Sequence, residues 1–436
     1  MTMTEHTTDI KAAVILKKGE GRTLKAGGPW VYDNEIDRTE GIYENGDIIA
    51  VRDFDGFFLG WGFINDHSKL RVRIMSRRED VPVTPALIES RIRAAWKYRK
   101  AVMADYISEF LSPEDAGSDY IPGAKEYTEL SCRLVFGEAD LLPGITIDKF
   151  SDVLVIESLA LGTDLMKESI LEACRKILLE DGVNIRGIYE RSDAKVRELE
   201  GLERVKGFIG EPFNTNVLIE ENGISYYVDV ENGQKTGFFL DQKFNRQAVR
   251  GLCRGKKVLD CFTHTGSFAL NAAVAGASEV LAVDASDTGI AQAKENAELN
   301  ILLDEIRFEV ADVFDLLPAL EEKGESFDVV ILDPPAFTKS RASVKKAVTG
   351  YREINMRGMR LVRNGGFLAT CSCSHFMEPE LFAKTLQEAA KGARRTLRQV
   401  EFRTQSPDHP ILWTGSGGTE NSYYLKFYIF QVFEEK

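Results

Sequence analysis

The stretch Val258-Leu-Asp-Cys-Phe-Thr-His-Thr-Gly-Ser-Phe268 decides the fold. It begins with two apolar residues and a carboxylate, passes through a short polar turn that ends at Gly266, and continues into Ala-rich sequence up to Ala277. This pattern predicts a strand, a loop and a helix. Gly266 has no side chain, so the loop backbone can approach a ligand closely. The spacing is not G-x-G-x-x-G and no G-K-[ST] follows, which excludes a dinucleotide fingerprint and a P-loop.

Acidic residues follow this strand and three further predicted strands. They are Asp260 and, after predicted strands over 279–283, 306–310 and 327–332, Asp284, Asp312 and Asp333. Open α/β sheets bind their ligands at the carboxyl ends of the strands, and a carboxylate accepts hydrogen bonds from a ribose diol. The set therefore predicts an adenosine-type site in which Asp284 holds the ribose. Taken singly, each acid could instead merely end its strand.

Several motifs are shared with one family of enzymes. They are VLDCFTHTGSFALNAA from Val258, the strand-end Asp284, Asp333-Pro334-Pro335-Ala336 with Phe337, GGFLATCSCS over 365–374 and GQKTGFFLDQ over 233–242. In these motifs, and over nearly its whole length, the chain resembles class I S-adenosylmethionine-dependent methyltransferases. More narrowly, it is similar to the bacterial 23S rRNA cytosine-C5 methyltransferases that carry an N-terminal PUA domain. The resemblance implies S-adenosylmethionine as cofactor and large-subunit (23S) rRNA as substrate.

The resemblance also implies which residues form the cofactor site. The expected contacts are Asp260, Phe262, Thr265, Gly266, Asp284, Asp312, Asp333, Phe239 and Gln242. For the segment with Phe239 and Gln242, the alternative is a plain helix start capped by Asp241.

Cys373 is the expected nucleophile, because, counted from Gly366, it falls on the family's nucleophile position. A thiolate that adds to carbon 6 of cytosine activates carbon 5 and can leave again afterwards. Asp333 would hold the ring nitrogen or the exocyclic amine. Cys371 is the rival nucleophile, since side chains alternate along a strand. Ala336 stands where some related enzymes have a second Cys, so a single-cysteine mechanism is expected and the base that removes the carbon-5 proton is left open.

Two other functions remain open at this stage. Asp-Pro-Pro-Ala-Phe also resembles the element of enzymes that methylate exocyclic amines, which would give N2-methylguanine or N6-methyladenine and leave Cys373 structural. A non-catalytic RNA-binding ribosome assembly factor that merely holds the cofactor is the other alternative. C-x-C-x-H over 371–375 lacks a second ligand cluster, so no metal site is expected.

The charge distribution favours a nucleic-acid partner in spite of a net charge of −13. Residues 336–363 carry a net charge of +7, directly after the Asp-Pro-Pro motif, which leaves −20 for the rest of the chain. A solvated helix face is the alternative explanation. We predict that the segment binds RNA phosphates, and the candidate contacts are Lys339, Arg341, Lys345, Lys346 and Arg352.

Length and pattern predict an α/β protein of several domains. Residues 1–80 are turn-rich with short strands and resemble a PUA-like RNA-binding β-barrel, 81–200 form an α+β middle domain, and 201–436 form a Rossmann-like class I methyltransferase domain. With no signal peptide, no membrane-length apolar run and six irregularly spaced cysteines, a cytoplasmic protein without membrane contact is expected. The oligomeric state is left open, a homodimer included.

Overall fold

The computed structural model describes residues 12–113, 120–415 and 422–434. The described residues form two compact units. The first contains those of Met1–Val217, Val228–Phe238 and Pro407–Ser422, and the second those of Leu218–Tyr227, Phe239–Ser406 and Tyr423–Lys436. Among the described residues, no helix is long and apolar enough to cross a membrane.

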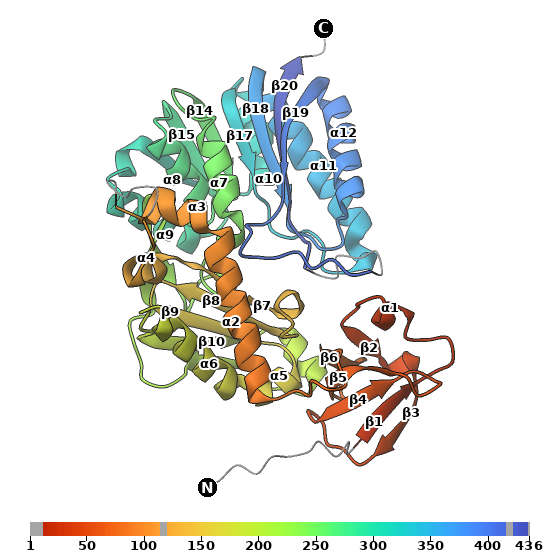
Figure 1. Cartoon of the computed structure of the whole chain (residues 1–436). Coiled ribbons are helices and arrows are strands. Elements are labelled where there is room, and N and C mark those ends of the chain that lie inside the picture. The colour runs from red at the N-terminus through yellow and green to blue at the C-terminus, as the bar shows by residue number, and fades with distance from the viewer. Residues whose placement is uncertain (1–11, 114–119, 416–421, 435–436) are drawn as a thin grey trace. The chain divides into compact units, whose positions relative to one another are not determined.

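A seven-stranded sheet forms the centre of the second unit (Figure 1). Its order is β16-β15-β14-β17-β18-β20-β19. The strands are β14 (Lys257–Cys261), β15 (Glu279–Asp284), β16 (Ile306–Val310), β17 (Phe327–Leu332), β18 (Val362–Ser372), β19 (Arg395–Arg403) and β20 (Lys426–Glu434). The strands from β14 to β18 run parallel, and β20 pairs antiparallel with both β18 and β19. This arrangement confirms the predicted class I methyltransferase fold.

Helices cover both faces of this sheet, as right-handed crossovers between parallel strands require. They are α7 (Lys243–Arg250), α8 (Ser267–Val274), α9 (Asp287–Leu299), α10 (Val313–Glu322), α11 (Val344–Leu361) and α12 (Pro379–Ala393). In the core under α10, α11 and α12, Leu259 and Leu281 pack with Leu317, Tyr351 and Phe382. All residues of the central strands β14 and β17 except Lys257 and Asp328 are buried, which explains why most of their residues are apolar.

The sequence predicts a strand over 367–371 that follows a turn at Gly365-Gly366, and strand β18 is longer than this. It already begins at Val362, so Gly365 and Gly366 lie inside the strand rather than before it. The pairing of β17 with β18 shifts register between Phe327 and Val329, and Gly365 has a φ of 84°. A bulge of this kind needs a residue that tolerates positive φ, which Gly does.

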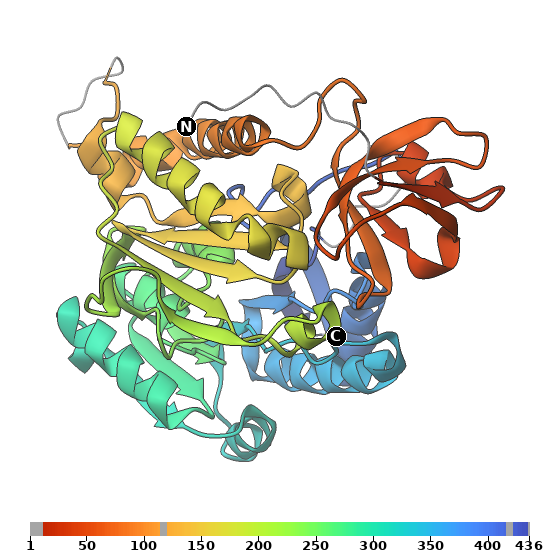
Figure 2. The same cartoon turned by 90° about the horizontal axis from the view of Figure 1, so that it is seen from below.

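The N-terminal part of the first unit is a six-stranded sheet of order β2-β6-β5-β4-β1-β3, which curls around its own core (Figure 2). Its elements are β1 (Ala12–Leu16), α1 (Arg22–Lys25), β2 (Trp30–Tyr32), β3 (Ile36–Gly41), β4 (Ile48–Arg52), β5 (Phe58–Ile64) and β6 (Leu70–Ser76). Val14, Val51, Ile64 and Val72 are fully buried in that core. The predicted small β domain is thereby confirmed.

The rest of the first unit is built on a five-stranded sheet of order β11-β10-β9-β8-β7, with α2 packed against α6 and β7. Its elements are α2 (Pro85–Val102), α3 (Ala104–Tyr106), α4 (Ala124–Glu129), β7 (Cys132–Phe136), β8 (Ile145–Phe150), β9 (Val153–Ser158), α5 (Leu161–Leu165), α6 (Lys167–Glu180), β10 (Gly187–Ser192) and β11 (Val205–Phe208). The hairpin of β12 (Asn216–Glu221) and β13 (Ile224–Asp229) follows in the chain.

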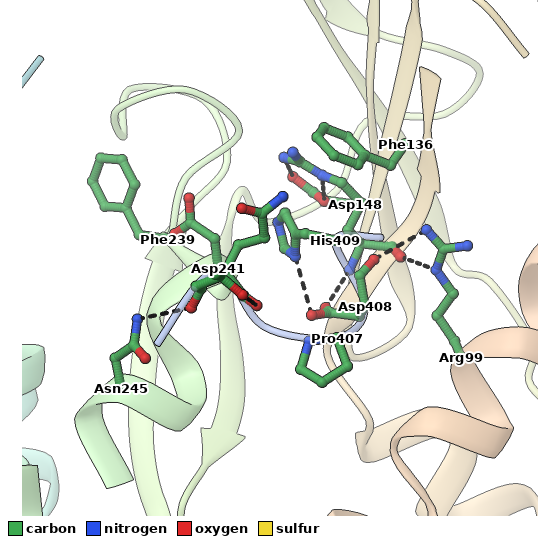
Figure 3. A network of polar contacts seen from close by, with 12 residues as sticks. Arg99, Phe136, Asp148, Phe239, Asp241, Asn245, Pro407, Asp408 and His409 are labelled. Atoms are coloured by element: carbon green, nitrogen blue, oxygen red, sulfur yellow. Dashed lines mark hydrogen bonds and ion pairs between the residues drawn. The ribbon is translucent and has the colours of Figure 1, made fainter. Parts of the chain in front are cut away.

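A buried polar network in the first unit holds the segment that starts at Pro407 (Figure 3). Arg99 of α2 is fully buried and donates to both carboxylate oxygens of Asp140, at 2.5 and 2.7 Å, and to the Asp408 carbonyl at 3.0 Å. The Asp408 carboxylate accepts the Arg133 amide at 2.9 Å and lies 3.0 Å from Nδ1 of His409. Every charged member therefore has a partner, which is what makes burial of such groups tolerable.

Candidate functional site

The loop after β14 adopts a backbone shape that few residues favour. Gly266 has a φ of 83°, and a Cβ added there would lie 3.0 Å from Cβ of Ala293. Phe262 and His264 also have positive φ, at 65° and 53°. For residues other than Gly, each such conformation costs on the order of 1–3 kcal/mol and must be enforced by its surroundings. The loop is thus held in a fixed, close-fitting shape at the carboxyl edge of the sheet.

One residue just before this loop, Asp260, and one within it, Thr265, carry buried polar groups. Asp260 is fully buried and accepts a 2.5 Å hydrogen bond from the Thr263 hydroxyl. Burial raises the pKa of Asp260 to about 7, against the opposing effect of the Thr263 hydroxyl. Oγ1 of Thr265 is buried and has no hydrogen-bond partner among the described residues. A polar ligand would give it one, so the loop fits a nucleoside group.

Asp284 ends β15 beside the same loop. Its Oδ2 accepts the His264 amide and its Oδ1 accepts the Ser286 amide, both at 2.9 Å. Each carboxylate oxygen keeps a further lone pair, so the side chain can still accept from a ribose diol. Asp312 is exposed and caps α10, with Oδ1 accepting the Phe314 amide at 2.8 Å. The Asp312 carboxylate therefore has a structural role at the end of its strand, as a helix cap, which is the alternative to cofactor binding considered from the sequence.

Gln242 and Asp333 are brought together with Cys371. Nε2 of Gln242 lies 3.1 Å from Oδ1 of Asp333, and the Cys371 thiol donates to the same oxygen at 2.8 Å. Burial raises the pKa of Asp333 to about 6, and the Cys371 hydrogen bond opposes the shift. Phe239, which precedes Gln242 in the chain, packs edge-on against His264 at 5.0 Å between ring centroids.

Asp241 does not cap the helix that follows this segment. Helix α7 begins without a side-chain cap, and the Asp241 carboxylate accepts the Tyr424 hydroxyl at 2.7 Å instead. The alternative in which Asp241 caps the helix is therefore wrong, because its carboxylate binds the Tyr424 hydroxyl and not the amides at the start of α7.

Cys371 and Cys373 differ in burial and in their partners. Cys371, the last residue but one of β18, is fully buried, and burial together with the Asp333 carboxylate raises its pKa well above the ordinary value. Cys373 lies just past the end of β18, is partly exposed, and has its Sγ 3.9 Å from the Pro334 carbonyl. Of the two thiols, Cys373 is the one that a substrate can reach.

Lys426 belongs to this region and was not predicted from the sequence. It is the first residue of β20, is 2% exposed, and lies opposite Ser372 in the pairing of β18 with β20. The only sequence signal was the apolar run 427–430, which marks a strand but not its partner.

The basic segment divides into paired and exposed side chains. Arg357 and Arg360 of α11 reach Glu321, at 3.3 and 3.5 Å, and Arg363 reaches Asp328 at 3.0 Å. The exposed side chains, for which no ion pair is found within the described part of the chain, are Lys339, Arg341, Lys345, Lys346 and Arg352. These are the five residues predicted to bind RNA, and their charge is available to an external partner.

Comparison with known proteins places these features in a family. Residues 201–419 match the family model of S-adenosylmethionine-dependent methyltransferases, and residues 14–77 match that of PUA-like domains. The chain is 39% identical to ribosomal RNA large subunit methyltransferase I of Aeromonas salmonicida, over 95% of this chain and 97% of the relative. It is 37% identical to the protein of the same name from Pseudoalteromonas translucida, over 97% of this chain and 100% of the relative.

Solved structures share the fold. A methyltransferase crystallised with SAH has a TM-score of 0.76 at 20% identity, and a SAM-dependent methyltransferase from Streptococcus mutans has a TM-score of 0.75 at 21% identity. Each match covers 96% of this chain and 99% of the other. The cofactor of this methyltransferase domain is S-adenosylmethionine. The loop that contains Thr265, together with Asp284 at the end of β15, fits the adenosine part of this cofactor.

Proposed function

Because the chain belongs to the family of ribosomal RNA large subunit methyltransferase I, we propose that it methylates carbon 5 of a cytosine in 23S rRNA. The observation that carries this proposal is the position of Cys373. Its thiol is partly exposed at the carboxyl edge of the sheet, next to Asp333-Pro334. The acceptor base would lie at this edge, and an enzyme acting on rRNA would work in the cytoplasm.

The proposed chemistry assigns a distinct task to each side chain. The Cys373 thiolate forms a bond to carbon 6 of cytosine, which makes carbon 5 nucleophilic. S-adenosylmethionine, when bound, supplies an electrophilic methyl group that carbon 5 accepts. Removal of the carbon-5 proton then restores the double bond and expels the thiolate. The target base must leave any stack to reach the thiol.

Asp333 would orient and polarise the base. Burial raises its pKa to about 6, so its carboxyl can hold or release a proton near neutral pH. In its acid form it can donate to the ring nitrogen, and in its ionised form it can accept from the exocyclic amine. Gln242 fixes the carboxyl through the 3.1 Å hydrogen bond to Oδ1.

The test of this proposal is the identity of the product. Purified protein is incubated with labelled S-adenosylmethionine and protein-free 23S rRNA, and the rRNA is digested to nucleosides. Labelled 5-methylcytosine supports the proposal. A methylated purine would replace it with the exocyclic-amine mechanism, which needs no thiol, and no transfer to rRNA or to a ribosomal assembly intermediate would favour the non-catalytic alternative.

Asp284→Asn is expected to weaken S-adenosylmethionine binding. Loss of a charged hydrogen-bond acceptor costs about 1.5–3 kcal/mol, which corresponds to a roughly 10- to 150-fold higher Kd. Isothermal titration calorimetry with S-adenosylmethionine measures the change. Asp287→Asn is the matched control, because Asp287 is exposed in the first turn of α9, and it should leave Kd unchanged. Equal effects of both changes would remove Asp284 from the cofactor site.

The double change Lys345→Ser and Lys346→Ser is expected to weaken rRNA binding. For each RNA phosphate that the variant no longer neutralises, the slope of log K against log salt should fall by roughly 0.7–0.9. Filter binding over a range of salt concentrations measures the slope. Arg357→Ser with Arg360→Ser is the matched control on the same helix, because those side chains are paired with Glu321. If the salt dependence of rRNA binding changed only in the Arg357→Ser, Arg360→Ser control, Lys345 and Lys346 would not contact the RNA.

A further inference from the structure

Lys426 is a buried cation held by carbonyl groups. It is 2% exposed, and its Nζ donates to the Ser374 carbonyl at 2.7 Å and to the Tyr424 carbonyl at 2.8 Å. Within the described part of the chain, no carboxylate lies close enough to form an ion pair with it. An ammonium group has three donors, so one N–H remains after these two bonds. Burying such a charge without a counter-ion is costly, which calls for an explanation.

The two cysteines at the end of β18 are the groups that favour the charged form of Lys426. Burial lowers the pKa of Lys426 to about 8, and Cys373 and Cys371 oppose that shift. Lys426 therefore stays mostly protonated at neutral pH. Cys371 remains a thiol there, because burial and Asp333 raise its pKa far above neutrality. Cys373 is left as the group whose ionised form would complement the ammonium.

We propose that Lys426 is a positioning residue that favours the thiolate form of Cys373 and fixes the backbone next to it through the Ser374 carbonyl. This inference rests on the proposed role of Cys373 as nucleophile. A nearby ammonium is a known means of stabilising a thiolate at neutral pH. Antiparallel pairing of β20 with β18 delivers the ammonium to this place, since Lys426 lies directly opposite Ser372.

The other titratable groups of this region do not replace Lys426. Tyr351 of α11 shares hydrogen bonds of 3.0 Å with the hydroxyls of Ser372 and Ser374, and burial raises its pKa, so it stays neutral. Burial, with Lys426 next in effect, lowers the pKa of His375, which is therefore uncharged at neutral pH. Asp333 is negative or neutral and disfavours a nearby thiolate. Arg341 acts on His375 but is exposed to solvent, which screens its charge.

The test is the pH dependence of Cys373 alkylation in the full-length protein. Iodoacetamide reacts with the thiolate, and mass spectrometry of peptides resolves Cys373 from the other cysteines. Lys426→Met should raise the midpoint pH of alkylation by about one unit, so that the reaction at neutral pH slows about tenfold. Lys426→Arg keeps the charge and should restore most of the rate.

Lys149→Met is the matched control. Lys149 is also fully buried and donates to two carbonyls, those of Thr128 and Leu130, both at 2.8 Å, but it belongs to the other unit. It should leave the Cys373 midpoint unchanged. An unchanged midpoint in Lys426→Met, with folding verified by S-adenosylmethionine binding, would overturn the inference.

A second measurement covers the case in which Lys426→Met fails to fold. Coupling between two sites is reciprocal, so Cys373→Ala should lower the Lys426 pKa, followed by NMR titration of the lysine side chain. No change in that titration would equally overturn the inference. Neither measurement uses RNA or methyl transfer. A product other than 5-methylcytosine would therefore contradict the proposed function without changing the interpretation of the alkylation and NMR results.

Discussion

Cys373→Ala is expected to reduce methyl transfer to rRNA at least about a thousandfold, whereas Cys371→Ala should stay within about tenfold of wild type. Without the Cys373 sulfur, carbon 6 of cytosine has no nucleophile and carbon 5 is not activated. Cys371 donates a hydrogen bond to Asp333 and lies 3.5 Å from Nε2 of Gln242, and after its loss Gln242 can still donate to the same carboxylate oxygen. Initial rates with labelled S-adenosylmethionine and 23S rRNA measure both effects.

A trapping experiment separates covalent catalysis from a structural role of Cys373. In rRNA that contains 5-fluorocytidine, carbon 5 carries no proton to remove, so the bond between Cys373 and carbon 6 should persist after methyl transfer. Wild type and Cys371→Ala should give a complex that survives denaturing electrophoresis, and Cys373→Ala should give none. A complex that depends on Cys371 would reverse the assignment of the two thiols.

The methyltransferase fold was readable from the sequence because its signals are local. The strand near Val258, the glycine at 266 and the apolar helix after it each follow from neighbouring residues, and the structure has β14, the loop and α8 there, although β14 extends past Asp260 to Cys261. The positive φ of Phe262 and His264 was not foreseeable, because residue type predicts such values only for Gly. The surrounding structure imposes them.

The features that depend on contacts between residues far apart in the chain were not predicted from the sequence. Strands β19 and β20 complete the sheet by antiparallel pairing, and only that pairing brings Lys426 opposite Ser372. The basic segment shows the same limit, since the acids that neutralise Arg357 and Arg363 include Glu321 and Asp328, which precede the segment in sequence. A charge count within one window cannot separate paired from free side chains.

Arg246→Met is expected to destabilise the second unit by about 3–5 kcal/mol, the range found when one partner of a buried ion pair is removed. Arg246 of α7 donates to Glu221 at 2.7 Å, and the two side chains are 1% and 0% exposed. It also donates to the Phe239 carbonyl at 2.7 Å and to the Ser267 hydroxyl at 3.3 Å. The substitution leaves a buried carboxylate without its cation.

Urea unfolding followed by circular dichroism, with hydrogen exchange of peptides from β14 and α8, measures this loss in the unit concerned. Arg357→Met is the matched control, because its partners Glu353 and Glu321 are partly exposed, and an ion pair of this kind contributes less than about 1 kcal/mol to stability.

Arg246 also donates to the carbonyl of Phe239 and to Ser267, the first residue of α8, so its loss should loosen both sides of the predicted cofactor site. Weaker S-adenosylmethionine binding should therefore accompany faster exchange in Arg246→Met, and a variant as stable as the control would show that the buried pair contributes no more than a surface one.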